Sequence, residues 1–321
     1  MGKLKLKKKA KKIIILSVVL FLFISIGLHS CIKLYRQKQY EKTNEYKLIS
    51  LGYSLDDTKV LLDKLKDKEI DYLLNNSKSD LYLNVINQKY FIYDYFYNYI
   101  DYYNKNRGKN INEIVEIINT NRDKDYYTST NDTDISKGYL MLTNKYYHLN
   151  EEYIPENLTT ISTTYAYGDY GSKQVTKDTY DAYMNMWNAS HEAGFYLMVS
   201  SAYRDYNKQV SVYEDYKKKQ GEKYADSIAA RPGYSEHQTG YALDIFEKGY
   251  TQKTFQDSES YSWLLNNSYK YGFIERYPKD KENITGYSYE SWHFRYVGID
   301  AATYIYNNHI TFDEYYAYFV K

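Results

Sequence analysis

A nearly uninterrupted apolar run near the start of the chain constrains where the rest of the chain can fold. The run extends from Ile13 to Ile32 and follows a basic segment, residues 2–12, that contains seven lysines. As a helix with a rise of about 1.5 Å per residue it is about 30 Å long, which is the thickness of a bilayer's hydrocarbon core. Lysines that precede a span stay in the cytoplasm. We therefore expect a single-pass cell-membrane protein with a cytoplasmic basic tail (residues 1–12), an anchor (residues 13–32) and an extracytoplasmic remainder.

Two kinds of processing would change the mature N-terminus. A cleaved signal peptide usually has a shorter apolar core and a small-x-small cleavage site, and only Ser25-Ile26-Gly27 loosely fits that pattern. Residues 28–31 vaguely resemble a lipoprotein processing site, although a histidine before the small residue is atypical. An uncleaved anchor is favoured, while cleavage and lipidation of Cys31 stay open. Because Cys31 is the only cysteine, no disulfide can stabilise the exported part.

The composition fits a folded protein without a strong electrostatic preference. The chain has 321 residues, of which 43% are hydrophobic, and this is enough for a packed core. Its 42 basic and 41 acidic residues give a formal net charge of +1. No overall field therefore points to nucleic acid or to a polyanionic substrate, and we expect no nucleic-acid partner.

The sequence after the anchor has two regions that differ in composition and hydrophobic pattern. Residues 33–138 contain short amphipathic patterns, such as Val60, Leu61 and Leu65 at helical spacing, and predict a helical spacer without a recognisable binding motif. A cluster of Asn, Asp, Thr, Ser and Gly predicts a boundary around Asp132 to Tyr153, where Leu140 to Tyr146 reads as a strand. We place the second domain at residues 139–321.

The second domain mixes helices with short strands. Asp205 is suited to cap a helix that ends at Gly221, while residues 195–200 and residues 292–297 read as strands. Since no regular alternation of strand and crossover helix is present, the pattern favours the α+β class.

Two short segments of this domain supply the residue types of a catalytic zinc site. The segment Ser235-Glu-His-Gln-Thr-Gly-Tyr-Ala-Leu-Asp244 is followed by Glu290-Ser-Trp-His293, which begins 46 residues after Asp244. Catalytic zinc takes three ligands from His and Asp or Glu and keeps one open position. His237, Asp244 and His293 match that set. Glu290 is a further carboxylate that can accept and return a proton near the metal.

Each of these residues also has an ordinary explanation when it is taken alone. A single histidine is more often a hydrogen-bonding group than a ligand, and we do not expect His148, His191 or His309 to bind metal. The combination of the two segments, in this order, is what points to a site. No Gly-x-Ser-x-Gly or Ser-x-x-Lys motif supports a rival nucleophile.

The two segments resemble known family motifs. They are similar to the Ser-x-His-x-x-Gly-x-Ala-x-Asp and Glu-x-Trp-His motifs of the D-alanyl-D-alanine metallocarboxypeptidases of the vancomycin-resistance type, in the lysostaphin, D-Ala-D-Ala peptidase and hedgehog group. Both motifs match at every defined position, and the resemblance covers about residues 139–321. It implies a small antiparallel sheet that carries Zn²⁺, and hydrolysis of the terminal D-alanine of peptidoglycan stem peptides. By it, His237, Asp244 and His293 would bind zinc and Glu290 would be the catalytic base.

The same resemblance suggests residues that contact the substrate. Residues 201–204 are similar to the family's Ser-x-Tyr-Arg segment, whose arginine, here Arg204, contacts the substrate and the oxyanion. Ser235 corresponds to a serine that hydrogen-bonds the substrate, and Gln209 stands where the family often has a substrate-side glutamine. Trp292 is a candidate for the pocket wall, although a core position is an equal alternative.

Three alternatives stay open at this point. An L,D-carboxypeptidase or an endopeptidase would use the same chemistry, because specificity depends on loops such as residues 249–257 and 280–289. A zinc-binding interaction domain without turnover is permitted by the hedgehog relative, but Glu290 argues against it. An anchored sensor, in which the helical half binds a partner, is compatible with either.

Overall fold

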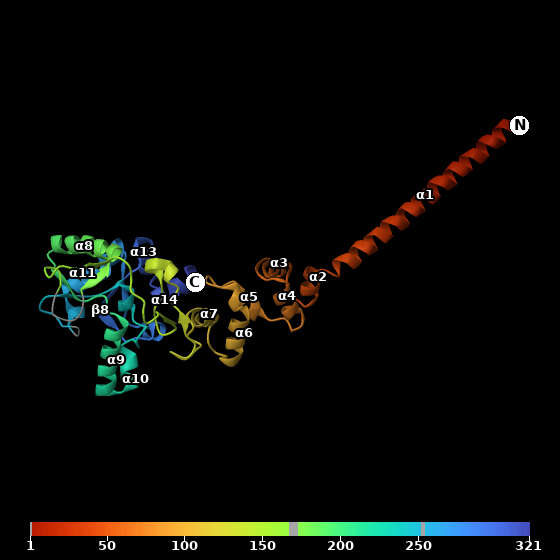
Figure 1. Ribbon diagram of the computed structural model, residues 1–321. Coiled ribbons are helices and arrows are strands. Elements are labelled where there is room, and N and C mark those ends of the chain that lie inside the picture. The colour runs from red at the N-terminus through yellow and green to blue at the C-terminus, as the bar shows by residue number, and fades with distance from the viewer. Residues whose placement is uncertain (1, 167–172, 252–253) are drawn as a thin grey trace. The chain divides into compact units, whose positions relative to one another are not determined.

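The computed structural model describes residues 2–166, 173–251 and 254–321. Within these residues the chain forms two compact units, residues 1–101 and residues 102–321. Figure 1 labels their main elements. Gln252 and Lys253, in one of the loops expected to set specificity, lie outside the described residues.

The first unit begins with one long helix, α1 (Gly2–Tyr40). Within this helix, Lys7–Tyr40 is long and apolar enough to cross a membrane, and its large apolar side chains are exposed. A helix of this kind at the N-terminus is either a membrane span or a signal sequence.

Short helices follow, as the amphipathic patterns predicted. They are α2 (Asn44–Ser50), α3 (Leu55–Lys64), α4 (Asp67–Leu74), α5 (Asp80–Ile86), η1 (Tyr93–Tyr95) and α6 (Phe96–Lys105). Thr43, Ser54 and Ser79 precede three of these helices, and each side chain accepts a hydrogen bond from a first-turn backbone N–H. Leu61 and Leu73 are fully buried on the inner faces.

The second unit is longer than the domain expected from residue 139. Helix α7 (Ile111–Asn119) packs with α14 (Phe312–Phe319) inside this unit. The predicted strand at Leu140 to Tyr146 is wrong: β2 comprises only Tyr147–His148 and pairs in parallel with β1 (Asn131–Asp132). The side-chain oxygen of Asn144 accepts hydrogen bonds from the backbone N–H groups of residues 146 and 147, and this favours a turn over an extended strand.

A four-stranded antiparallel sheet forms the centre of the described part of this unit. Its strands are ordered β5 (Leu197–Ser201), β6 (Ala242–Glu247), β8 (Glu290–Tyr296) and β7 (Phe273–Tyr277). One face contributes Leu243 and Phe294, which are register partners, to a core shared with α8 (Lys177–Glu192) and α11 (Glu259–Asn267). Figure 1 shows α8, α11 and β8 in the same part of the unit. The expected α+β class with a small antiparallel sheet is confirmed.

Other elements surround this sheet. They are η2 (Ile135–Leu140), β3 (Leu158–Thr160), β4 (Gln174–Thr176), α9 (Tyr206–Gln220), α10 (Glu222–Ile228), η3 (Glu236–Thr239), η4 (Phe255–Asp257), η5 (Ser268–Tyr271), α12 (Glu282–Thr285) and α13 (Ile299–Asn308). Asp205 caps α9 by accepting a hydrogen bond from the Lys208 N–H at 2.7 Å, and Gly221 ends that helix with φ +85°. Both ends of α9 agree with the sequence prediction.

Candidate metal centre and substrate pocket

Asp244 and His293 meet because their strands place them opposite each other. They are register partners in the antiparallel pair β6–β8, so their side chains leave the same face of the sheet. The carboxylate oxygen Oδ1 of Asp244 lies 3.3 Å from Nδ1 of His293. The neighbouring pair, Leu243 and Phe294, points to the opposite face and into the core.

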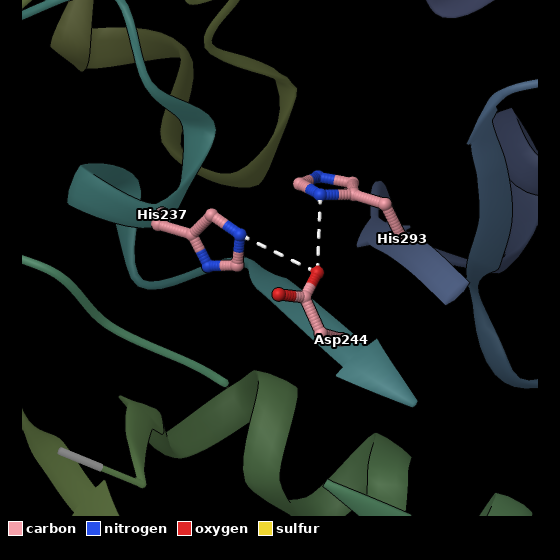
Figure 2. Close-up of side chains that lie close together, drawn as sticks. All are labelled: His237, Asp244 and His293. Atoms are coloured by element: carbon pink, nitrogen blue, oxygen red, sulfur yellow. Dashed lines mark ion pairs between the residues drawn. The ribbon is translucent and has the colours of Figure 1, made fainter. Parts of the chain in front are cut away.

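His237 approaches the same carboxylate from the short helix before β6. Its Nε2 lies 3.5 Å from Asp244 Oδ1, and Figure 2 shows both histidine rings directed toward that oxygen. Gly240 lies between η3 and β6 with φ +74°, a conformation that favours glycine. A Cβ atom there would lie 3.0 Å from Pro155 Cγ, which explains why the turn contains the smallest residue.

The three side chains fit a zinc ion. One potential ligand atom from each of His237, Asp244 and His293 lies within 4.8 Å of the other two, and all three residues are buried. Asp244 Oδ1 has no hydrogen-bond partner among the described residues. Ligand atoms on a tetrahedral zinc ion lie about 2.0–2.2 Å from the metal, and therefore about 3.3–3.5 Å from one another. The two separations from Asp244 Oδ1, 3.5 Å to His237 and 3.3 Å to His293, match that geometry.

The charges around Asp244 suit a cation. Burial by itself would raise the pKa of the Asp244 carboxyl, but His237 and His293 outweigh burial and hold its pKa well below the usual value. The Asp244 carboxyl is therefore ionised at neutral pH. Burial lowers the pKa of His237, although the charge of Asp244 opposes that shift, and the neutral imidazole is the form that can bind a metal.

Glu290 reaches this centre through an irregularity in strand pairing. Residues three apart in a regular strand point to opposite faces, yet a Glu290 carboxylate oxygen lies 3.6 Å from Nδ1 of His293. The β7–β8 register shifts from Glu275↔Phe294 to Tyr277↔Glu290. Between these two pairs, β8 advances by four residues while β7 advances by two. This bulge brings Glu290 to the face of the sheet that carries Asp244 and His293.

The surroundings of Glu290 favour its protonated form. Burial raises the pKa of Glu290 to about 8, and the negative charge of Asp244 acts in the same direction. His293 and Arg204 oppose the shift. A divalent cation at the neighbouring centre would lower the pKa of Glu290, because a nearby positive charge favours the carboxylate.

Arg204 lies beside the centre on the segment after β5. Its Nη1 donates a hydrogen bond to Gln209 Oε1 at 2.8 Å, and its Nη2 donates to Ser201 Oγ at 3.2 Å. Gln209 in turn donates to the Ala230 carbonyl oxygen at 2.7 Å. Gln209 thus orients the guanidinium group, a contact that the sequence did not indicate.

The centre opens into a pocket with a volume of about 310 Å³. Arg204, Gln209, Ser235, Glu290 and Trp292 line it together with the three metal-site residues, so every site residue proposed from the sequence lies in one place. The Trp292 ring also stacks on Phe246 at an interplanar angle of 11°, so this side chain contributes to the wall and to packing. The pocket also has an aromatic lining that sequence reasoning missed: Tyr216, Tyr224, Tyr277, Tyr287 and Tyr289.

The residues behind the metal site were also missed. Nδ1 of His237 lies 2.7 Å from the Ala202 carbonyl oxygen, whereas Nε2 of His293 faces the buried Glu236 carboxylate at 3.4 Å. Glu236 occupies an undefined position of the family motif, so the motif gave no reason to single it out.

Comparison with known proteins gives the family. Residues 172–299 match the VanY family model, described as D-alanyl-D-alanine carboxypeptidase. The D-alanyl-D-alanine carboxypeptidase of Enterococcus faecalis strain V583 is 43% identical over 140 residues, which are 41% of this chain and 51% of that protein. The chain spans about half to two thirds of the length of the first curated relatives that it matches.

Solved structures extend this comparison. A variant of the vancomycin-resistance D,D-pentapeptidase VanY, in complex with Zn(II), is 36% identical and aligns over 55% of this chain and 98% of that one, with a TM-score of 0.48. The bifunctional D-Ala-D-Ala dipeptidase and D-Ala-D-Ala carboxypeptidase VanXYC of Enterococcus gallinarum is 39% identical over 130 residues, which are 39% of this chain and 68% of that protein. The chain belongs to the VanY family. The LdcB LD-carboxypeptidase is also 36% identical to this VanY-family chain, over 60% of it and 91% of LdcB, with a TM-score of 0.56.

Proposed function

We propose that this VanY-family chain is a zinc-dependent D-alanyl-D-alanine carboxypeptidase that removes the terminal D-alanine of peptidoglycan stem peptides. The observation that carries the proposal is the buried set of His237, Asp244 and His293 with a fourth carboxylate, Glu290, beside it in one pocket. The complex of a VanY relative with Zn(II) supports zinc as the metal.

The proposed chemistry assigns the proton transfers to Glu290. Zinc held by His237, Asp244 and His293 would supply a Lewis acid that polarises the scissile carbonyl and makes water a better nucleophile at neutral pH. Glu290 accepts a proton from the attacking water and delivers it to the amine of the departing D-alanine. Its carboxylate is near the centre but outside the ligand set, as a general base requires.

Arg204 is the proposed electrostatic partner of the reaction. Its guanidinium is fixed by hydrogen bonds to Gln209 and Ser201, so it can stabilise negative charge on the substrate without first reorganising. We assign Ser235 to a hydrogen bond with the substrate, and Trp292 to the wall against which the peptide lies.

Helix α1 also supports a proposal for the place of action. We propose that this helix is an uncleaved anchor and that the second unit acts outside the cytoplasmic membrane, where stem peptides are exposed. The lysines before the apolar run support this orientation.

An L,D-carboxypeptidase is the second candidate, because LdcB is described as an LD-carboxypeptidase and aligns with this chain over 91% of its own length. The proposed residues would act identically on a tetrapeptide stem. Only the fit of the last two residues of the stem peptide in the pocket would differ between the two activities.

A single experiment separates these activities. The full-length protein, purified in detergent and loaded with zinc, is incubated separately with pentapeptide and tetrapeptide muropeptides, and the products are measured by mass spectrometry. We expect the pentapeptide to lose one D-alanine and the tetrapeptide to stay intact. Trimming of the tetrapeptide alone would establish the L,D activity instead. Cleavage of neither stem by zinc-loaded protein would contradict catalysis and favour a binding domain.

A further inference from the structure

Four charged side chains form a buried cluster behind the metal site. Arg276 donates from Nε to Glu236 Oε1 at 2.7 Å and from Nη1 to Asp313 Oδ2 at 2.6 Å. Arg295 Nη1 lies 3.4 Å from the same Glu236 oxygen. The side chains of Glu236, Arg276 and Arg295 are 0% exposed and that of Asp313 is 3% exposed. Two positive and two negative charges cancel, which makes this burial tolerable.

The second oxygen of Glu236 is directed elsewhere. Both arginines approach Oε1, whereas Oε2 lies 3.4 Å from Nε2 of His293. Neither Oε2 nor this Nε2 has a hydrogen-bond partner in the described part of the chain. Leaving a buried polar atom unpaired is costly, and a carboxylate oxygen can only accept. The two atoms are complementary when Nε2 carries the ring proton.

From this arrangement we infer that Glu236 is a positioning residue for His293. The inference rests on the proposed function, in which His293 binds zinc. Glu236 accepts a hydrogen bond from Nε2–H, so the proton stays on Nε2 and the lone pair of Nδ1 is directed toward Asp244 and the metal. Partners of this kind fix the orientation of a histidine ligand and increase its basicity.

The rest of the cluster explains how Glu236 keeps its direction. Glu236 Oε1 accepts a hydrogen bond from Arg276 and forms an ion pair with Arg295, so the carboxylate cannot rotate without breaking those contacts. Arg276 is anchored in turn by Asp313 on α14, and Asp313 accepts a hydrogen bond from Asn144 Nδ2 at 2.7 Å.

Asp313 provides a matched control, because it belongs to the same cluster but forms its hydrogen bonds in the described chain with Arg276 and Asn144 rather than with His293. Asp313→Asn and Glu236→Gln each remove one negative charge at nearly constant size. If the cluster is purely structural, both variants should lower stability, and the two folded proteins should bind zinc with equal affinity. A positioning role predicts that only Glu236→Gln alters the metal site.

The test measures zinc affinity by competition with a chromophoric chelator, using full-length proteins in detergent. We expect Glu236→Gln to bind zinc about 10–100-fold more weakly than wild type. We expect the zinc affinity of Asp313→Asn to stay within about threefold of wild type, because the hydrogen bonds of Asp313 in the described chain are to Arg276 and Asn144 and not to a proposed ligand. With cobalt(II) in place of zinc, the visible ligand-field spectrum should shift in Glu236→Gln and stay unchanged in Asp313→Asn.

If Glu236→Gln does not fold, the double variant Glu236→Gln/Arg295→Met replaces it. Glu236 is the ion-pair partner of Arg295 in the described chain, so this variant keeps the Arg276–Asp313 pair and a balanced charge. Zinc affinity near wild type in either Glu236 variant, or an equal loss in Asp313→Asn, would overturn the inference. Failure of the wild-type protein to bind zinc would instead overturn the proposed function.

Discussion

Asp244 and His293 are register partners on β6 and β8, with 3.3 Å between the carboxylate oxygen Oδ1 and the ring nitrogen Nδ1. Two of the three proposed ligands are therefore held by the hydrogen-bonded sheet. Sites built on strands are held more precisely than sites on loops. His237 completes the set from the short helix that leads into β6.

The first prediction concerns the ligands. His237→Ala, Asp244→Ala and His293→Ala each remove one of three metal contacts, so each should lose bound zinc and activity together. His148→Ala is the control: His148 lies 3.6 Å from Asp132, away from the pocket, and should keep both. Zinc content is measured by atomic absorption after gel filtration. Stoichiometric zinc in His237→Ala would remove this residue from the ligand set.

The sequence predicted which residues gather in the candidate site, because the chemistry depends on residue types at short separations, and those are visible in a chain. It also predicted α9, because Asp205 and Gly221 act locally. It could not show that the β8 bulge turns Glu290 toward His293, since strand register depends on pairing with β7. The contacts of Glu236 with Arg276 and Arg295 join residues 40 or more positions apart, and no local pattern indicates them.

The second prediction concerns the guanidinium group. Arg204→Lys keeps the positive charge but loses the planar fork that is held by Gln209 and Ser201. We expect kcat/KM for release of D-alanine to fall about 10²–10³-fold, as for loss of one oxyanion donor. Zinc content and the shape of the pH–rate profile should stay the same, because no proton-transfer group changes. An altered profile would show that Arg204 also influences the protonation of Glu290.

The third prediction concerns pH and stability. Burial raises the pKa of Glu275 to about 7 from 4.5, although the Tyr261 hydroxyl donates to its carboxylate at 2.5 Å. Between pH 4.5 and 7 the folded protein thus binds more protons than the unfolded one. As the pH rises through this range, the free energy of unfolding should therefore fall, by on the order of 3 kcal/mol from Glu275 alone.

Glu275→Gln isolates this contribution, because the amide keeps the size and does not ionise. We expect it to be more stable than wild type at pH 8 and to show little advantage at pH 4. Urea unfolding without zinc is followed by tryptophan fluorescence, since Trp187, Trp263 and Trp292 all lie in the second unit. A difference between the two proteins that does not change with pH would contradict the raised pKa.

The fourth prediction concerns topology. If α1 spans the membrane with its lysines inside, protease added to intact protoplasts should digest the second unit. Immunoblotting with an antibody against residues 300–321 detects its loss, and a cytoplasmic protein serves as the control. Protection of the second unit until the protoplasts are lysed would reverse the proposed orientation.

The most direct test of the account is the rate at which zinc-loaded wild-type and Glu290→Gln proteins release D-alanine from a pentapeptide stem. The amide keeps the size of Glu290 but cannot accept the proton, so zinc should stay bound while the rate falls by at least about 10²–10⁴-fold. Release by Glu290→Gln at a rate near wild type would contradict the proposed mechanism, and loss of zinc from this variant would make Glu290 a ligand rather than the base.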